Sequence, residues 1–116
     1  MTSAVKVDIA DRIALVTFDR GDGLNALSAA VMRELTETAR SLGRDTRVSA
    51  VVLTGTATIF SAGADLKDPE LASRDKVGLL ERREALKLGP DLCRAWEEIE
   101  AITISAVEGF CVGGGV

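Results

Sequence analysis

Two glycine-containing segments hold the residues of this chain with the greatest potential for chemistry. One places Gly63 among small residues at 61–65, and the other contains Gly109 and three consecutive glycines at 113–115. Small side chains let a bound molecule reach the main chain, so each segment could present a backbone N–H to it. Two such donors directed at one carbonyl oxygen would stabilise the enolate or oxyanion that it becomes. The alternative is that these glycines serve turns and close packing, and the residues alone leave both interpretations open.

Other chemistries that use glycine or histidine do not fit this sequence. It contains no Gly-x-x-x-x-Gly-Lys-Ser/Thr phosphate loop, no Gly-x-Gly-x-x-Gly dinucleotide pattern and no Gly-x-Ser-x-Gly elbow. It also contains no histidine, which excludes Ser-His-Asp and Cys-His catalysis and ordinary zinc sites. Any chemistry must therefore use carboxylates, backbone amides or a group supplied from elsewhere.

Composition limits the class of protein further. The 116 residues are 47% hydrophobic and carry a formal net charge of −4, which favours a single globular domain and disfavours a nucleic-acid surface. No apolar run is long enough for a membrane span, and the N-terminus lacks a signal-peptide pattern. The two cysteines, Cys93 and Cys111, lie in segments that we expect to be buried. We therefore expect a soluble protein in a reducing, cytoplasmic compartment.

The first half of the chain predicts two strands and a helix. Alternating apolar residues predict a strand over 5–9, and an apolar run predicts a strand buried on both faces over 13–18, after a tight turn at 11–12. Ser28 is a favourable N-cap for a helix that stops at Gly43. The expected buried stripe of this helix consists of Met32, Leu35, Ala39 and Leu42.

The second half predicts two further buried strands, over 48–53 and 103–107, each followed by one of the glycine segments. The charged stretch 68–88 predicts a solvated, loosely held helical segment. After a break at Gly89-Pro90, a helix is predicted to start at Pro90. Its expected buried residues are Leu92, Trp96 and Ile99. Strands that alternate with helices indicate an α/β layered fold.

Three blocks of the sequence, at 25–28, 60–67 and 106–115, resemble the enoyl-CoA hydratase/isomerase (crotonase) family. They are Asn-Ala-Leu-Ser, Phe-Ser-Ala-Gly-Ala-Asp-Leu-Lys and Ala-Val-Glu-Gly-Phe-Cys-Val-Gly-Gly-Gly. The resemblance covers essentially the whole chain and about the N-terminal half of a typical member. It implies an α/β fold, a spiral of β-β-α units, truncated before the C-terminal helical region. Residues 1–116 would then be the N-terminal portion of one domain, incomplete at its C-terminus.

The resemblance also implies a substrate and a set of site residues. The substrate would be an acyl-CoA thioester, with no cofactor besides the coenzyme A that is part of it. The oxyanion-hole amides would be those of Ala64 and Gly114. The substrate-binding positions would be Ala26, Ala62, Ala64, Asp65, Leu66, Lys67 and Gly114. The full-length protein would be a homotrimer or hexamer, with no nucleic acid or membrane span among its partners.

The resemblance further implies a catalytic glutamate three residues after Gly114, just past Val116, and a second one beyond it. Neither lies within the 116 residues, so the sequence leaves hydratase, isomerase, hydrolase and decarboxylase reactions open. We expect an acyl-CoA-processing enzyme, by family default a hydratase (lyase) or isomerase. One alternative is a non-catalytic acyl-CoA-binding or assembly paralogue without the acid/base glutamates. Another is a half-domain that is unfolded or requires a partner.

A few other polar side chains have two possible roles. Asp65 could be a general base, but a residue hydrogen-bonded within its turn is the more ordinary interpretation. Lys67 could pair with a phosphate of coenzyme A or be solvated. Arg82 and Arg83 could belong to a lid over the acyl pocket, although a solvated helix face is favoured. Cys111 is expected to be a small buried apolar side chain, because no histidine is present to activate it.

Overall fold

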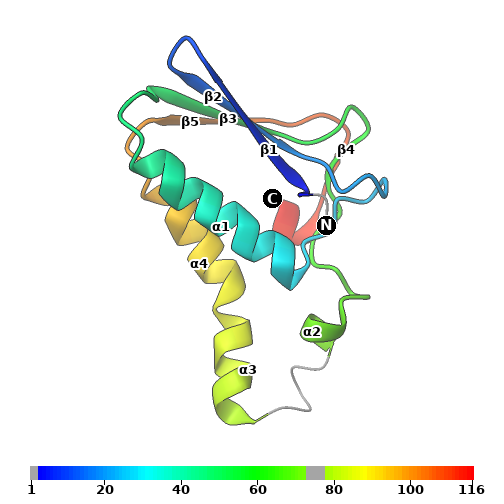
Figure 1. Ribbon diagram of the computed structural model, residues 1–116. Helices are drawn as coiled ribbons and strands as arrows, with labels where there is room; N and C mark the ends of the chain where they lie inside the picture. Colours follow the sequence, from blue (N-terminus) through cyan, green and yellow to red (C-terminus); the bar gives the residue numbers. More distant parts are fainter. Residues whose placement is uncertain (1–2, 73–77) are drawn as a thin grey trace.

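A four-stranded sheet forms one layer of the molecule (Figure 1). The computed structural model describes residues 3–72 and 78–116. The sheet consists of β1 (Val5–Ala10), β2 (Ile13–Phe18), β3 (Ala50–Thr54) and β5 (Ile102–Ala106), in the order β1-β2-β3-β5. β1 and β2 are antiparallel and joined by the predicted tight turn, whereas the other neighbours are parallel. The four predicted strands are therefore confirmed, although β3 begins and ends later in the sequence than predicted.

Two helices form the second layer. α1 (Ala29–Gly43) and α4 (Leu88–Glu97) lie side by side against one face of the sheet, and α3 (Leu79–Leu86) continues from α4 away from it (Figure 1). α2 (Pro69–Ala72) is a single turn. The core lies between the layers and includes Val16, Phe18, Leu35, Val51 and Ile99. No helix in the described parts of the chain is both long enough and apolar enough to cross a bilayer.

Local sequence signals explain where α1 begins and ends. The Ser28 Oγ accepts a hydrogen bond from the Val31 N–H at 3.2 Å, which satisfies one of the free donors of the first turn. The predicted apolar stripe is buried against the sheet, and the helix ends at Gly43. The prediction for this helix is confirmed. It could be made from the sequence because the cap, the apolar stripe and the terminal glycine all lie within the helix or next to it.

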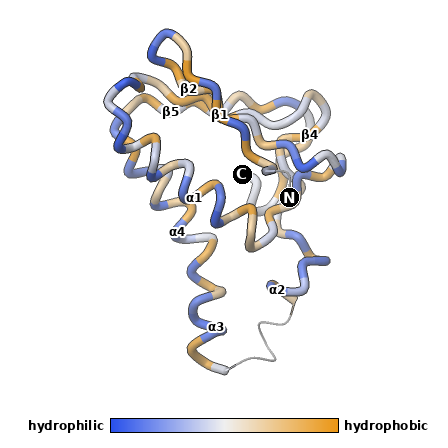
Figure 2. The backbone as a smooth tube through the Cα atoms, viewed as in Figure 1, coloured by the Kyte–Doolittle hydropathy of each residue, from blue (hydrophilic) through white to orange (hydrophobic). Residues whose placement is uncertain are grey.

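The outer face of the sheet corrects the prediction of strands buried on both faces. Ile13 is 46% exposed and Ile102 is 68% exposed, because the helices cover only the opposite face. The register places Leu15, Val52 and Ile104 in a row across the same outer face. Figure 2 shows that β2 and β5 are nevertheless hydrophobic along much of their length. Within the described residues, this sheet therefore has one covered face and one open apolar face.

The start of α4 also differs from the prediction. The helix begins at Leu88, and α3 and α4 are separated only at Lys87. Pro90 lies in the first turn, where its missing N–H removes no intrahelical hydrogen bond, so Gly89-Pro90 does not break the helix. Leu92 and Trp96 are only half-buried where they pack against the core, and Ile99 is buried just past the helix. Cys93 is exposed, which corrects its expected burial.

A second, smaller sheet was not predicted. β4 (Ile59–Ser61) and β6 (Phe110–Cys111) pair in parallel, with a register shift between Ile59 and Ser61. A 3-10 turn at Gly113–Gly115 follows β6. Because β4 ends at the first glycine segment and β6 lies within the second, their pairing brings together segments that are about fifty residues apart in the sequence.

Candidate functional site

The two glycine segments pack backbone against backbone. The Val112 N–H donates to the Ser61 carbonyl at 3.1 Å, just beyond the β4–β6 pairing. A Cβ atom on Gly63, which has φ +90°, would lie 3.0 Å from the Val112 oxygen and 3.3 Å from the Gly114 nitrogen. Glycine at position 63 is therefore required by conformation and by close approach.

Packing also explains Gly109 and Gly115, in line with the interpretation that these glycines serve turns and close packing. A Cβ on Gly109 would lie 2.0 Å from the Thr58 oxygen, and a Cβ on Gly115 would lie 2.7 Å from the Ser61 Cβ. Gly114 is different. A Cβ there would make only ordinary contacts, the nearest at 3.5 Å to the Leu27 side chain, and the φ of this residue lies outside the left-handed region. Contacts with the rest of the described chain therefore do not require glycine at 114.

The backbone around Ala64 runs parallel to Leu27. The Leu27 N–H donates to the Gly63 carbonyl at 2.7 Å, and the Asp65 N–H donates to the Leu27 carbonyl at 3.0 Å. Because Gly63 and Asp65 make the two hydrogen bonds of this parallel bridge, the Ala64 N–H takes no part in it. It lies 3.9 Å from the position that a Cβ on Gly114 would take.

The N–H groups of Ala64 and Gly114 are both unengaged. Neither donates a hydrogen bond to any residue that the structure describes, and both residues are exposed. Two neighbouring backbone donors without an intramolecular acceptor are available to a ligand. Together they could bind one oxygen that carries a partial or full negative charge.

A buried hydrogen-bond network supports the backbone beneath Ala64. Asn25 is almost fully buried with φ 47°, and its side-chain amide donates to the carbonyls of Phe18 at 2.7 Å and Phe60 at 3.3 Å. The Ser61 Oγ donates to the Asn25 carbonyl at 2.7 Å and accepts from the Gly63 N–H at 3.1 Å. Buried networks in which every member is paired fix a single backbone geometry. Asn25 belongs to the block 25–28 that resembles the family, but its role in supporting the backbone beneath Ala64 was not predicted.

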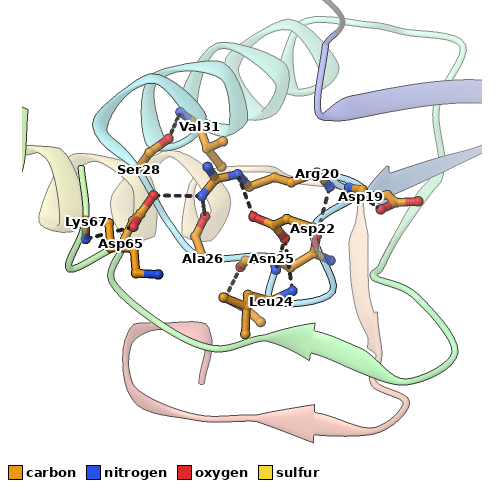
Figure 3. Close-up of polar contacts among 12 residues, drawn as sticks. Asp19, Arg20, Asp22, Leu24, Asn25, Ala26, Ser28, Val31, Asp65 and Lys67 are labelled. Carbon is orange, nitrogen blue, oxygen red and sulfur yellow. Dashed lines mark hydrogen bonds and ion pairs between the residues drawn. The ribbon is translucent and has the colours of Figure 1, made fainter. Parts of the chain in front are cut away.

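Asp65 is engaged on both carboxylate oxygens (Figure 3). Its Oδ2 accepts from the Arg20 Nη1 at 3.0 Å, and its Oδ1 accepts from the Lys67 N–H at 3.0 Å. The hydrogen bond from Arg20, with that from the Lys67 backbone, holds the pKa of Asp65 below its usual value. A carboxylate stabilised in its charged form is a poor general base at neutral pH, which supports the interpretation of Asp65 as a turn residue.

The other expected binding positions lie beside Leu27 or within three residues of Ala64 in the sequence. Ala26 is buried, and its carbonyl accepts from the Arg20 Nη1 at 2.8 Å. Ala62 donates its N–H to the Leu24 carbonyl at 2.9 Å. The structure therefore places Ala26 and Ala62 in the supporting backbone. The remaining two, Leu66 and Lys67, are exposed, and Leu66 is 91% exposed.

Arg20 is the functional candidate that the sequence analysis missed. It lies directly after β2, and its guanidinium reaches both Ala26 and Asp65 (Figure 3). Nothing in its local sequence signals this role, because Asp65 is 45 residues away along the chain. Only the fold brings the two side chains together.

The lid residues suggested by the sequence lie elsewhere in the described structure. Arg82 and Arg83 line a groove of about 850 Å³ between α3 and α4, which shares no lining residue with the glycine segments or with Ala64. The described residues contain no cluster of three or more His, Cys, Asp or Glu side chains that could hold a metal ion.

Comparisons with known proteins show what the chain resembles as a whole. The family model for enoyl-CoA hydratase/isomerase matches residues 8–116. The chain is 34% identical to a probable enoyl-CoA hydratase of Mycobacterium leprae, over 96% of this chain and 40% of the relative. It is 33% identical to 4-chlorobenzoyl coenzyme A dehalogenase-2 of an Arthrobacter species, over 97% of this chain and 40% of the relative.

Solved structures give the same match in three dimensions. A Legionella pneumophila protein described as an enoyl-CoA hydratase/isomerase (crotonase) superimposes with a TM-score of 0.87 and 29% identity. The match covers 99% of this chain and 44% of that structure. The chain thus spans about two fifths of the length of the relatives that it matches.

Proposed function

The chain belongs to the enoyl-CoA hydratase/isomerase family, and from this premise we propose that the protein binds an acyl-CoA thioester and polarises its carbonyl group with the N–H groups of Ala64 and Gly114. The fold is that of the crotonase family, as the sequence resemblance implied. Residues 1–116 are proposed to form the N-terminal part of a longer domain.

The observation that carries this proposal is the pair of unengaged N–H groups on adjacent segments. Hydrogen bonds from both would strengthen as negative charge develops on the thioester oxygen, which is the condition for lowering a barrier. The polarised thioester would have a more acidic α-proton and a more electrophilic β-carbon. A Cβ on Gly114 would make only ordinary contacts with the described residues, so a glycine there is consistent with the close approach of a ligand.

We propose hydration of an enoyl-CoA as the reaction, in line with the name of the Mycobacterium leprae relative. Because the Arthrobacter relative is named a coenzyme A dehalogenase, the type of reaction on the thioester has to be tested directly. The sequence contains no histidine, and the carboxylate next to Ala64, that of Asp65, is paired with Arg20. The acid and base are therefore proposed to be carboxylates outside residues 1–116.

A direct test adds crotonyl-CoA to the full-length protein and follows the loss of the conjugated thioester absorbance. Gly114→Pro removes one donor, and we expect kcat to fall about a hundredfold while coenzyme A binding is retained. Because proline could also disturb the turn, a second variant replaces the Gly114 amide with an ester, which removes the hydrogen with little change of shape. Unchanged turnover in the ester variant would refute the assignment. An unaltered thioester in the wild-type protein, with coenzyme A bound, would refute the hydratase reaction.

Two further expectations from the resemblance also remain proposals. The full-length protein is proposed to form trimers or hexamers, which light scattering would measure directly. No cofactor is proposed besides the coenzyme A of the substrate. Turnover by protein that has been dialysed against a chelator would support this, and restoration of lost activity by an added metal or organic cofactor would contradict it.

A further inference from the structure

The Arg20 side chain joins two loops that are distant in the sequence. Its Nη1 donates to the Ala26 carbonyl at 2.8 Å and to the Asp65 Oδ2 at 3.0 Å, and its backbone N–H donates to the Asn25 Oδ1 at 2.9 Å. The Arg20 side chain is 25% exposed and that of Asp65 is 16% exposed, so the ion pair is partly shielded from water. Hydrogen bonds between ionised partners are stronger than neutral ones, and shielding increases their effect.

On the outer side of Ala64, the described residues add one further attachment to the Arg20–Asp65 ion pair: the Asp68 N–H donates to the Asp65 carbonyl at 3.2 Å, and the Asp68 carboxylate accepts from the Ala29 N–H at 2.7 Å. The segment around Ala64 is joined to Leu27 only by an isolated bridge of two backbone hydrogen bonds, not by a strand. Ala64 is itself exposed, as are the next two residues after Asp65. On its inner side the segment is fixed at Gly63 by the Ser61 hydroxyl, one residue before the proposed oxyanion donor. A restraint at Asp65 therefore fixes the other side of Ala64.

We infer that Arg20 is a positioning residue, which by tying the Asp65 carboxylate to the Ala26 carbonyl holds the Ala64 N–H in place beside Gly114. Its effect on turnover rests on the proposed function. The structural part of the inference, the restraint on residues 63–65, does not. Reaction rates are sensitive to such restraints, because a displacement of about 1 Å in a catalytic group can cost about a hundredfold.

Direct binding of substrate phosphate by Arg20 is the competing role, and its surroundings disfavour it. The Asp22 carboxylate lies 3.5 Å from the Arg20 Nε, so two carboxylates flank this one guanidinium. Hydrogen bonds keep the pKa of both Asp22 and Asp65 below their usual values, chiefly from the Leu24 N–H for Asp22 and from Arg20 for Asp65. Both are ionised at neutral pH, and an approaching phosphate would meet their negative charge.

The test compares Arg20→Gln, Asp65→Asn and the double variant in the full-length protein, with crotonyl-CoA as substrate. We expect each single variant to lower kcat about tenfold and to change KM less than about threefold. The kcat of the double variant should be no lower than that of the slower single variant. Arg20→Lys, which keeps the charge, should recover part of the loss. The matched control is Arg47→Gln, which breaks the pair between the exposed Arg47 side chain and Asp45 away from the site and should retain full activity.

Hydrogen–deuterium exchange tests the restraint independently of turnover. In peptides that contain Leu27 and Asp65, Arg20→Gln should accelerate amide exchange about tenfold or more, whereas Arg47→Gln should not. Unchanged exchange in Arg20→Gln would overturn the inference, even if the wild-type protein turned over crotonyl-CoA. A raised KM with an unchanged kcat would also overturn it, in favour of ligand contact. If the wild-type protein were inactive, the proposed function would fail while the exchange result still decided the role of Arg20.

Discussion

At the residue scale, four of the five glycines in the two glycine segments differ in what surrounds their α-carbons; the fifth, Gly113, has φ +57°. Gly63, Gly109 and Gly115 face backbone or a fixed side chain within about 3 Å of where a Cβ would lie, whereas a Cβ on Gly114 would have no described atom closer than 3.5 Å. The first three make the close packing of the two segments possible. Gly114 contributes an exposed surface at which a ligand can reach the main chain.

Adjacent alanine substitutions separate these roles. Gly115→Ala should reduce the free energy of unfolding by about 2 kcal/mol, because its methyl group would overlap Ser61. Gly114→Ala should change the free energy of unfolding by less than about 1 kcal/mol, because its methyl group would make ordinary contacts. Urea denaturation of the full-length protein measures both. Equal losses, or a larger loss for Gly114→Ala, would contradict this account of the site.

Some of the site residues could be predicted from the sequence and others could not. The glycine segments were recognisable by composition, but Ala64 and Gly114 were singled out only by resemblance to a family. Arg20 and Asn25 act through contacts with residues about 35 to 45 positions away, which no local pattern reveals. A contact of that kind becomes visible only when the fold is known.

At the element scale, Asp68 links two helices. Its Oδ2 accepts from the Ala29 N–H at 2.7 Å, in the first turn of α1, and its Oδ1 accepts from the Glu70 N–H at 3.0 Å, in α2. One carboxylate thus satisfies a free donor of each helix, next to the loop that carries Ala64. The beginning of α1 is therefore attached to that loop.

Removing the Asp68 carboxylate should weaken the N-terminal ends of both α1 and α2. We expect Asp68→Ala to lower the free energy of unfolding by about 1–2 kcal/mol, the usual range for loss of a helix cap, and Asp68→Asn to lower it less. Chemical denaturation followed by far-UV circular dichroism gives both values. Glu97→Ala, an exposed change in the last turn of α4, is the control and should be within about 0.5 kcal/mol of wild type. An equal effect of Asp68→Ala and the control would show that the cap contributes nothing.

The elements that could be predicted are those with local signals. α1 has a capping serine, an apolar stripe and a terminal glycine, so its limits agree with the prediction. β4 and β6 are three and two residues long and form only by pairing with each other, so no periodicity reveals them. The start of α4 was misplaced because Gly89-Pro90 was interpreted as a break, although a proline is tolerated in a first helical turn.

At the scale of the whole molecule, the sheet has an open apolar face. Ile13, Ile102 and Ile104 are at least 46% exposed, and β5 is an edge strand of the sheet. Exposed apolar patches and free strand edges promote association. The 116-residue chain produced by itself should therefore form dimers or larger species in light scattering. The double change Ile102→Lys and Ile104→Lys should shift it towards the monomer, and a monomeric wild-type chain at the same concentration would contradict this.

Acid should destabilise the molecule through its paired carboxylates. Hydrogen bonds from Arg20, from the Leu24 N–H and from Arg33 lower the pKa of Asp65, Asp22 and Glu70 respectively. Between these lowered values and the unfolded values of about 4, the unfolded chain binds more protons, so stability rises with pH. The contribution of these carboxylates to the free energy of unfolding is complete above their pKa values in the unfolded chain. It is lost as the pH falls through their pKa values in the folded protein. Urea midpoints from pH 7 to pH 3 should show this, and Asp65→Asn should flatten the dependence. An identical pH dependence in that variant would contradict the role of its ion pair.

The most direct test of the account measures the thioester itself. A non-reacting acyl-CoA labelled with ¹³C at the thioester carbonyl is bound to the full-length protein, and its infrared stretching frequency is recorded. Two hydrogen bonds from Ala64 and Gly114 should lower this frequency on binding, and the ester replacement at Gly114 should return it part of the way towards the value in water. A frequency that is the same for the wild-type protein and the ester variant would contradict the central claim.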